Sequence, residues 1–600
     1  MNKKIQNIVK DQYFLFTIKY FWLFRIYHLS KLKKYLLRIY FDVDKPNSDR
    51  KSIPPKIQKR ISNLFSKNNV PELNSIYLEK IKEINNQIIF KENLSDDFII
   101  KLATQEEGLK DIDFNKQYPD LEDYFALNRF IWLNQVLLEM PNLVLIKICR
   151  DLIENWIRYN KKITNDPKFE SYSISERIIS WIFFLRFIKD YSYDLNINYK
   201  IIAESIELQT KHLIKNLEYN GDLTNNHILN NARAIYIVGK VFENNNICQL
   251  GQDIFQSEVN NIIKDGVLQE GSSHYQILLT KSLIETCLIA DLYNDEQFKN
   301  FLQIIIVQML MVCNDLFSNN SSDTFPIFGD ISPDVSPKWF LGFPFNNNSL
   351  QSKWYKLFNY IPGKIKNINQ DYKKLDLNVE SLNWRKIINS DLEVWINLRS
   401  GNNPCHSHND NGTIVIYYKG NPVIIDLGLY SYTNSEFCKQ QKSEFAHNMP
   451  VINGFGVDVS SDSIVYNYNL FSHITYYKES KNKITYVIAY ANNIIKVKRV
   501  ITVHQNFCSI KDQIIRGKKK NIYEVNWHFN GKCEKTDQMK YQVNGIPMYL
   551  KTNSRIKPKT LNTFYSSNEY GHRQSISSLN IRSEIKLRDS FISEFHFLNG

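Results

Sequence analysis

The chain has 600 residues, of which 43% are hydrophobic, 13% aromatic and 23% charged. This composition excludes long disorder, a collagen-like repeat and a small disulfide-stapled scaffold, and the length predicts at least two domains. The 75 Lys and Arg exceed the 62 Asp and Glu by 13. A basic chain of this kind favours a polyanionic partner, so nucleic acid, anionic lipid and acidic polysaccharide all remain candidates.

The eight cysteines include no CxxC pair, and several lie in apolar runs. This pattern predicts buried free thiols rather than a disulfide framework or a zinc ribbon. Near the N-terminus, residues 13–25 are aromatic and basic, but Lys19 and Arg25 interrupt the run before it reaches membrane-spanning length. We therefore predict an amphipathic helix packed on the protein, with no transmembrane span and weak peripheral membrane contact as the alternative.

From about residue 121 to residue 317 the chain is a series of helical-period segments separated by breaks rich in Asn, Asp and Gly. Examples are Tyr124–Leu133, Glu176–Leu185, His227–Tyr236 and Phe301–Leu310. Stacked helical hairpins without a fixed repeat period form either an open solenoid or a closed ring. Of the two, we predict an (α/α) toroid.

After about residue 392 the pattern changes to short β-branched and aromatic runs with turn signals, and Lys419-Gly420-Asn421 between two of them predicts a hairpin. Many strands and few helices indicate an antiparallel β-sandwich. We therefore predict a multidomain α+β chain: an N-terminal helical and aromatic segment (1–120), an incomplete toroid (121–380) and a β-sandwich (381–600). The boundary falls in the stretch 363–385, which is rich in Lys, Asn and Asp.

Three polar clusters lie at expected helix ends. In the first, Asn225, Asn226 and His227 precede an apolar helix, where an Asn can simply cap the helix. The second runs from Asp265 to Tyr275 and predicts a loop between a helix that ends at Gly266 and one that begins near Ser272. The third, 328–334, is a polar turn after a long apolar helix. Each is a weak signal when taken alone.

A sharper cluster opens the β region with His406 and His408, and Asp426 and His447 follow it. Alternate residues of an extended segment point the same way, and His408, Asp426 and His447 supply ligands suited to zinc. The alternative is a hydrogen-bonded core network without metal. The string from His406 to Asp410 is also similar to that of metallo-β-lactamase-type hydrolases, but those continue with a His where this chain has Asn411.

Together these motifs resemble the heparinase II/III family of polysaccharide lyases. The resemblance covers residues 120–600 and rests on 225–227, 270–275, 329–330, 406–410, 426–432 and 447–448. It implies the same pairing of toroid and sandwich, and β-elimination across a glycosidic bond of a uronate-containing glycan. The implied partner is thus an acidic polysaccharide and not nucleic acid.

The resemblance implies catalytic roles for Asn226, His227, Tyr275 and His406. Uncharged Asn226 and His227 would neutralise the uronate carboxylate. Tyr275, with its pKa lowered by nearby donors, would move a proton, and His406 would be the second acid/base group. The residues expected to contact substrate are Asn225, Glu270, His274, Arg233, Tyr430 and Tyr432. Glu270 would orient Tyr275 or bind sugar.

The resemblance further implies a structural zinc held by His408, Asp426 and His447, and no organic cofactor. It places the protein in the periplasm or cell envelope, whereas the lack of a standard signal peptide favours the cytoplasm. Two other functions stay open: a catalytically silent glycan-binding or assembly factor, and a helical interaction scaffold. The scaffold requires His227, Tyr275 and His406 to lie far apart. The oligomeric state and the particular uronate polymer are not predicted.

Overall fold

The computed structural model describes residues 53–65, 73–82, 98–139, 143–189, 195–317, 325–340, 353–354, 360, 384–398, 405–433, 435–454, 472–490, 493–537, 540–552 and 560–597. Contacts divide the chain into Met1–Ile53 and Pro54–Gly600, and nearly all described residues belong to the second unit. The helix predicted around residues 13–25 and most of the boundary predicted at 363–385 lie outside the described residues.

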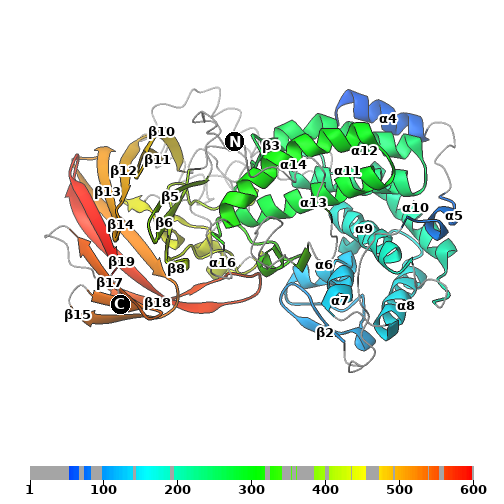
Figure 1. Cartoon of the computed structure of the whole chain (residues 1–600), viewed down its shortest axis with the longest axis horizontal. Coiled ribbons are helices and arrows are strands. Elements are labelled where there is room, and N and C mark those ends of the chain that lie inside the picture. The colour runs from blue at the N-terminus through cyan, green and yellow to red at the C-terminus, as the bar shows by residue number, and fades with distance from the viewer. Residues whose placement is uncertain are drawn as a thin grey trace, which may run out of the picture. The chain divides into compact units, whose positions relative to one another are not determined.

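The first half of Pro54–Gly600 is helical (Figure 1). Its longer helices are α4 (Pro55–Phe65), α6 (Leu121–Arg129), α7 (Trp132–Glu139), α8 (Leu143–Tyr159), α9 (Ser171–Phe187), α10 (Tyr199–Lys215), α11 (Asn226–Val241), α12 (Asn245–Ile262), α13 (Ser273–Leu292) and α14 (Glu296–Phe317). Helices α9, α11 and α13 pack in series, and α12 and α14 pack on α11 and α13 respectively.

The helices form two layers because their sequences differ in how much of each surface is apolar. Helices α9 and α13 are buried around nearly their whole circumference, whereas α8, α10 and α12 bury mainly one face. A helix that is apolar all round belongs inside, and an amphipathic helix belongs outside. This double layer confirms the predicted (α/α) toroid architecture.

Local signals fix the ends of the helices that carry the polar clusters. Asn225 caps α11 by accepting the His227 N–H, and Ser272 caps α13 by accepting the Tyr275 N–H. The predicted helix end at Gly266 is wrong, because α12 ends at Ile262. Asp265 and Gly266 have positive φ and form the turn of a two-stranded hairpin, β3 (Ile263–Lys264) and β4 (Val267–Leu268).

Part of the predicted N-terminal segment is described and contacts the helical layers. Helix α4 lies on α12, where Lys56 and Arg60 both pair with the buried Asp253. The short helix α5 (Ile76–Glu79) contacts α10. A small hairpin, β1 (Ile99–Lys101) and β2 (Glu106–Gly108), precedes α6.

The second half is an antiparallel β-sandwich, as predicted. One sheet has the order β10 (His473–Ser480), β11 (Lys483–Tyr490), β12 (Ile495–Val503), β13 (Phe507–Arg516), β20 (Ser590–Phe597), β17 (Ile546–Thr552), β16 (Lys540–Val543) and β15 (Cys533–Asp537). The other has the order β18 (Thr560–Ser566), β19 (Gln574–Lys586), β14 (Lys520–Phe529), β8 (Asn421–Ile424), β7 (Ile414–Tyr418), β6 (Leu392–Asn397) and β5 (Trp384–Asn389), with β9 (Pro450–Ile452) on β14.

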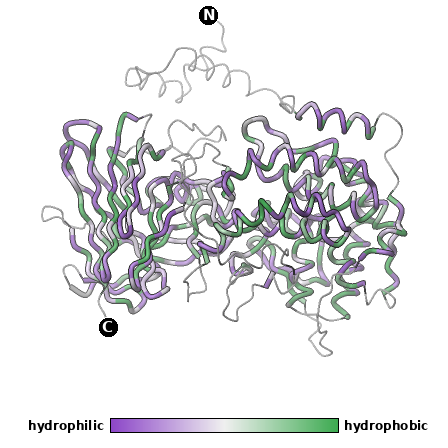
Figure 2. Tube along the Cα trace, turned by 45° about the horizontal axis from the view of Figure 1, so that its top comes forward, coloured by the Kyte–Doolittle hydropathy of each residue, from purple (hydrophilic) through white to green (hydrophobic). Residues whose placement is uncertain are grey.

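The sandwich core follows from the period-2 pattern of its strands. Alternate residues of β12 are buried, and Val497 and Ile501 share one cluster with Ile416 and Trp527 of the other sheet. Figure 2 shows hydrophobic and hydrophilic residues alternating along these strands. The predicted hairpin is confirmed, because β7 and β8 pair across Lys419 and Gly420, which both have positive φ.

Strands β6 and β7 are buried on both faces. Residues of the helical half approach this end of the sheet: Asp315 of α14 lies 3.7 Å from Lys386 of β5, and Phe328, in the loop after α14, stacks on Trp384. Among the described helices α14 alone is long and apolar enough to span a membrane, but half of that stretch is buried and the helix packs on α13. The free-thiol prediction is confirmed, since all eight cysteines are free and only Cys405 is partly exposed.

Candidate functional site

Two loops of the helical half meet the histidine loop of the β half. The His406 N–H donates to the Glu270 carbonyl (3.1 Å), and the Asp330 N–H donates to the His406 carbonyl (2.8 Å). Gly329 allows this close approach because its φ is +70°, and a Cβ there would lie 2.5 Å from the His406 oxygen. The sequence clusters that looked weak one by one are therefore hydrogen-bonded to one another.

The predicted acid/base residues lie in direct contact. The rings of Tyr275 and His406 stack with centroids 3.6 Å apart and planes 12° apart. The hydroxyls of Tyr275 and Tyr432 share a hydrogen bond of 2.9 Å, and the Tyr432 hydroxyl lies 3.5 Å from Nδ1 of His406. The structure thus brings Tyr275, His406 and Tyr432 into one cluster.

Asp330 connects this cluster with the predicted metal ligands. One of its carboxylate oxygens lies 3.2 Å from Nδ1 of His406, and the other lies 2.9 Å from Nε2 of His408. The Lys442 ammonium is 3.0 Å from the same carboxylate. Burial alone would raise the pKa of Asp330, but Lys442 and the two histidines hold it well below its usual range. A charged Asp330 accepts hydrogen bonds, so each facing ring nitrogen carries a proton.

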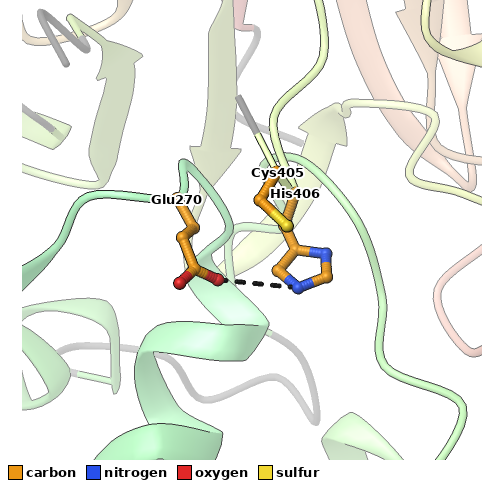
Figure 3. A group of neighbouring side chains, drawn as sticks. All are labelled: Glu270, Cys405 and His406. Atoms are coloured by element: carbon orange, nitrogen blue, oxygen red, sulfur yellow. Dashed lines mark ion pairs between the residues drawn. The ribbon is translucent and has the colours of Figure 1, made fainter. Parts of the chain in front are cut away.

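Glu270 contacts His406 rather than Tyr275, which corrects one of its two predicted roles. Its Oε1 accepts the Asn226 N–H (2.7 Å), and its Oε2 faces Nε2 of His406 at 3.6 Å (Figure 3). Asn225 also reaches this place, because its amide donates to Sγ of Cys405 (3.2 Å). Burial raises the pKa of Glu270, although His406 and the Asn226 N–H act in the opposite direction.

His227 lies at the start of α11, and its surroundings do not favour the uncharged side chain that we predict from the sequence. Its Nδ1 is 2.9 Å from Oε1 of Glu218, while Oε2 of Glu218 accepts from the Asn231 amide. The imidazole also packs on the Tyr172 ring, with centroids 4.6 Å apart. Burial would lower the pKa of His227, but the Glu218 carboxylate outweighs it and raises the pKa to about 9. His227 is thus a cation at neutral pH.

The predicted lowering of the Tyr275 pKa is wrong. Burial raises the pKa of Tyr275 well above its ordinary value, and the hydrogen bond from Tyr432 only partly offsets this. The pKa of Tyr432 is likewise raised by burial and by Asp330. Both phenols therefore hold their protons at neutral pH and are poised to donate rather than to accept.

Three predicted substrate contacts lie elsewhere. Arg233 is buried between Glu176 and Glu285, beside a cavity of about 20 Å³ that Asn226 also lines and that has room for about one water. It is not part of a basic surface. His274 is fully buried, where its Nδ1 accepts the Ser332 N–H (3.0 Å) and burial lowers its pKa to about 3. Tyr430 faces Phe437 and Arg573.

The three predicted zinc ligands converge. His408, Asp426 and His447 are buried, and each offers a ligand atom within 4.8 Å of the others. His447 Nδ1 lies 2.8 Å from Asp426 Oδ2, and Nδ1 of the buried His408 ring has no hydrogen-bond partner among the residues that the structure describes. His408 would hold the metal through this nitrogen while its Nε2–H donates to Asp330, a hydrogen bond that fixes the orientation of the ring. The donor set therefore fits zinc.

Sequence reasoning missed Glu218 and Lys442, and it noticed Asp330 without giving it a role. Glu218 lies in the helix-to-helix connection before α11, where no motif marks it. Lys442 follows a short helix, α16 (Glu436–Gln441), in a segment with no recognisable pattern. Only Asp330, which follows Gly329 in the polar turn 328–334, carried a usable signal.

Residues 396–592 match the family described as heparinase II/III-like, C-terminal. A search of curated proteins found no match. Among solved structures, a heparinase III is 14% identical, with a TM-score of 0.56 and coverage of 96% of this chain and 93% of that one. The heparan sulfate lyase HepC from Pedobacter heparinus is 15% identical, with a TM-score of 0.51 and 91% of each chain covered. At these identities the likeness shows the fold.

Proposed function

We propose that this chain, whose residues 396–592 match the heparinase II/III-like C-terminal family and which has the heparinase III fold, is a lyase that cleaves a uronate-containing polysaccharide by β-elimination. The single observation that carries this proposal is the stack of Tyr275 on His406. The stack brings together two groups able to transfer protons, at a place where the segments that carry Glu270, Asp330 and His406 are hydrogen-bonded to one another.

β-Elimination needs a base for the weakly acidic proton beside the uronate carboxylate and an acid for the departing glycosidic oxygen. Tyr275 holds its proton because burial raises its pKa, so it suits the acid. His406 is then the base that removes the carbon-bound proton. The electron pair of the broken C–H bond forms the double bond, and the C–O bond breaks as Tyr275 protonates the oxygen.

The carboxylate must lose its negative charge if the neighbouring carbanion is to form. His227 as a cation and the amide of Asn226 are suited to this, because both lie at the N-terminus of α11, where the helix dipole also favours an anion. The Asn226 Oδ1 has no partner among the described residues, so the amide is free to turn its NH₂ to a ligand. Glu218 maintains the charge on His227.

Zinc held by His408, Asp426 and His447 would serve structure, since its ligands come from separate segments of the β half. Asp330 would then hold the His406 ring in a fixed orientation, because one of its carboxylate oxygens binds His408 and the other binds His406. We propose surface or exopolysaccharide metabolism as the role of the protein, at the cell envelope or, as the alternative, in the cytoplasm. A catalytically silent glycan-binding factor of the same fold is the alternative. The scaffold hypothesis loses support, because Tyr275 and His406 touch and Glu270 joins them to Asn226.

The test is to incubate the protein with a panel of uronate polymers while following the ultraviolet absorbance of unsaturated uronate products. A lyase produces this absorbance together with new reducing ends. A glycan-binding factor binds one of the polymers and produces neither signal. If no polymer is bound or cleaved, the proposal fails.

A further inference from the structure

A second group of potential metal ligands lies beside His406. Glu270, Cys405 and His406 each offer a ligand atom within 4.8 Å of the others (Figure 3). Glu270 precedes α13 in the helical half, and the other two come from the loop that leads to β7 in the β half. This group shares no residue with His408, Asp426 and His447, and it differs from them in containing a sulfur ligand.

Two of its atoms are buried without a hydrogen bond. Oε2 of Glu270 and Nε2 of His406 have no hydrogen-bond partner among the described residues, although Glu270 is fully buried and His406 is 7% exposed. Leaving such polar groups unsatisfied destabilises the folded protein. Their separation of 3.6 Å exceeds a hydrogen bond. Two ligands about 2.0–2.1 Å from a tetrahedral metal lie roughly 3.3–3.4 Å apart, so a cation fits between them with little movement.

The donor set selects the kind of cation. One imidazole nitrogen, one carboxylate oxygen and one sulfur form a mixed set that suits Zn²⁺ or Cd²⁺, whereas Mg²⁺ and Ca²⁺ prefer oxygen alone. A fourth, open position would be left for water. Burial raises the pKa of the Cys405 thiol to about 12, so without a metal this sulfur stays protonated and unreactive.

We propose that Glu270, Cys405 and His406 form a binding site for a thiophilic divalent cation that inhibits the enzyme. On binding, the S–H bond of Cys405 breaks, its proton goes to solvent and a sulfur–metal bond forms without any change of oxidation state. The cation occupies Nε2 of His406 and stops that residue from accepting a proton. The binding stands on the geometry alone, while the inhibition rests on the lyase function proposed above.

Cadmium is the probe that tests the binding, because Cd²⁺ bound to a thiolate gives an ultraviolet charge-transfer absorption. We expect one equivalent of Cd²⁺ to produce this absorption in the wild type, and Cys405→Ser to abolish it. Cys438→Ser is the matched control, since Cys438 is a buried cysteine of the β half that forms no disulfide. This variant should keep the signal, with folding of each protein checked by circular dichroism.

Inhibition is measured within each variant as the Cd²⁺ or Zn²⁺ concentration that halves turnover. Loss of an outer-shell partner alone weakens metal binding about 10–100-fold, so Cys405→Ser should raise that concentration at least tenfold, and chelator should restore the wild type. Absorption that survives in Cys405→Ser overturns the site. Equal inhibition of wild type and Cys405→Ser overturns the inhibitory role. A Cys405-dependent signal in a protein that cleaves no uronate polymer leaves the cation site standing and removes the lyase.

Discussion

The ring of Tyr275 stacks on the ring of His406 with centroids 3.6 Å apart, although one residue belongs to helix α13 and the other to the loop before β7. The contact depends on Gly329, whose left-handed backbone lets the Asp330 N–H reach the His406 carbonyl. Neither half of the chain contains a complete site. The proposed chemistry therefore requires the helical half and the β half to pack together in the arrangement that brings Tyr275 and His406 into contact.

Asp330 is the first residue to substitute, because its carboxylate lies within hydrogen-bond or ion-pair distance of His406, His408 and Lys442. Asp330→Asn should lower kcat about 100-fold or more by releasing His406, which is the lower end of the effect of an acid/base group. It should also lower the free energy of unfolding by about 3 kcal/mol, since breaking a buried ion pair leaves its partner uncompensated. Urea denaturation measures this second effect.

The double variant Asp330→Asn/Lys442→Met supplies the control, because it removes the uncompensated ammonium. It should recover part of the lost stability but none of the lost kcat. The Asp330 pKa is depressed in the folded protein, so its stabilisation is present above the unfolded value of about 3.9 and is lost as the pH falls. A kcat that returns with stability would show that Asp330 does not position His406.

Glu218→Gln should return the pKa of His227 from about 9 toward its ordinary value. At pH 8 the variant then has a neutral His227, and KM for a uronate polymer should rise about tenfold because charge-assisted hydrogen bonds contribute about 1.5–3 kcal/mol. The exposed Glu204→Gln on α10 is the control. Equal KM values for wild type and Glu218→Gln at pH 8 would contradict a cationic His227.

The same pair predicts a pH-dependent stability. The folded-state pKa of His227 lies above that of an unfolded histidine, so its pairing with Glu218 stabilises the protein fully below about pH 6.5 and less as the pH rises through about 9. The Tm difference between wild type and Glu218→Gln should therefore be larger at pH 6 than at pH 10. A difference that grows with pH would exclude the charged pair.

The zinc site is tested by metal analysis in a Cys405→Ser background, so that only the ligands His408, Asp426 and His447 are counted. The parent should carry about one zinc, and His408→Ala should lose it and unfold at a lower temperature, because metal affinity contributes directly to folding. The exposed His572→Ala serves as control. Zinc retained in His408→Ala would rule out this ligand set.

Periodicity was enough to predict stacked helical hairpins followed by a β-sandwich, because helical and alternating apolar patterns report burial directly, whereas it left an open solenoid and a closed toroid as alternatives. Residue types and the family resemblance pointed to Tyr275 and His406, which the structure brings into contact, and to a zinc-ligand set that stays a prediction. Sequence could not show that His274 is buried against Ser332, nor that Arg233 is matched by Glu176 and Glu285. Those outcomes depend on which side of a helix faces its neighbours. The charge of His227 was also mispredicted from the sequence, because Glu218, in the connection before α11, raises the pKa of His227.

The central claim is that Tyr275 donates the proton that releases the glycosidic oxygen. The most direct measurement is the initial rate of unsaturated-product absorbance for wild type and Tyr275→Phe on the polymer that wild type cleaves fastest. The phenylalanine keeps the stack on His406, and Tyr565→Phe, which alters an exposed tyrosine, is the matched control. We predict a fall of about 10²–10⁴-fold for Tyr275→Phe alone. Equal rates for all three proteins would contradict the account.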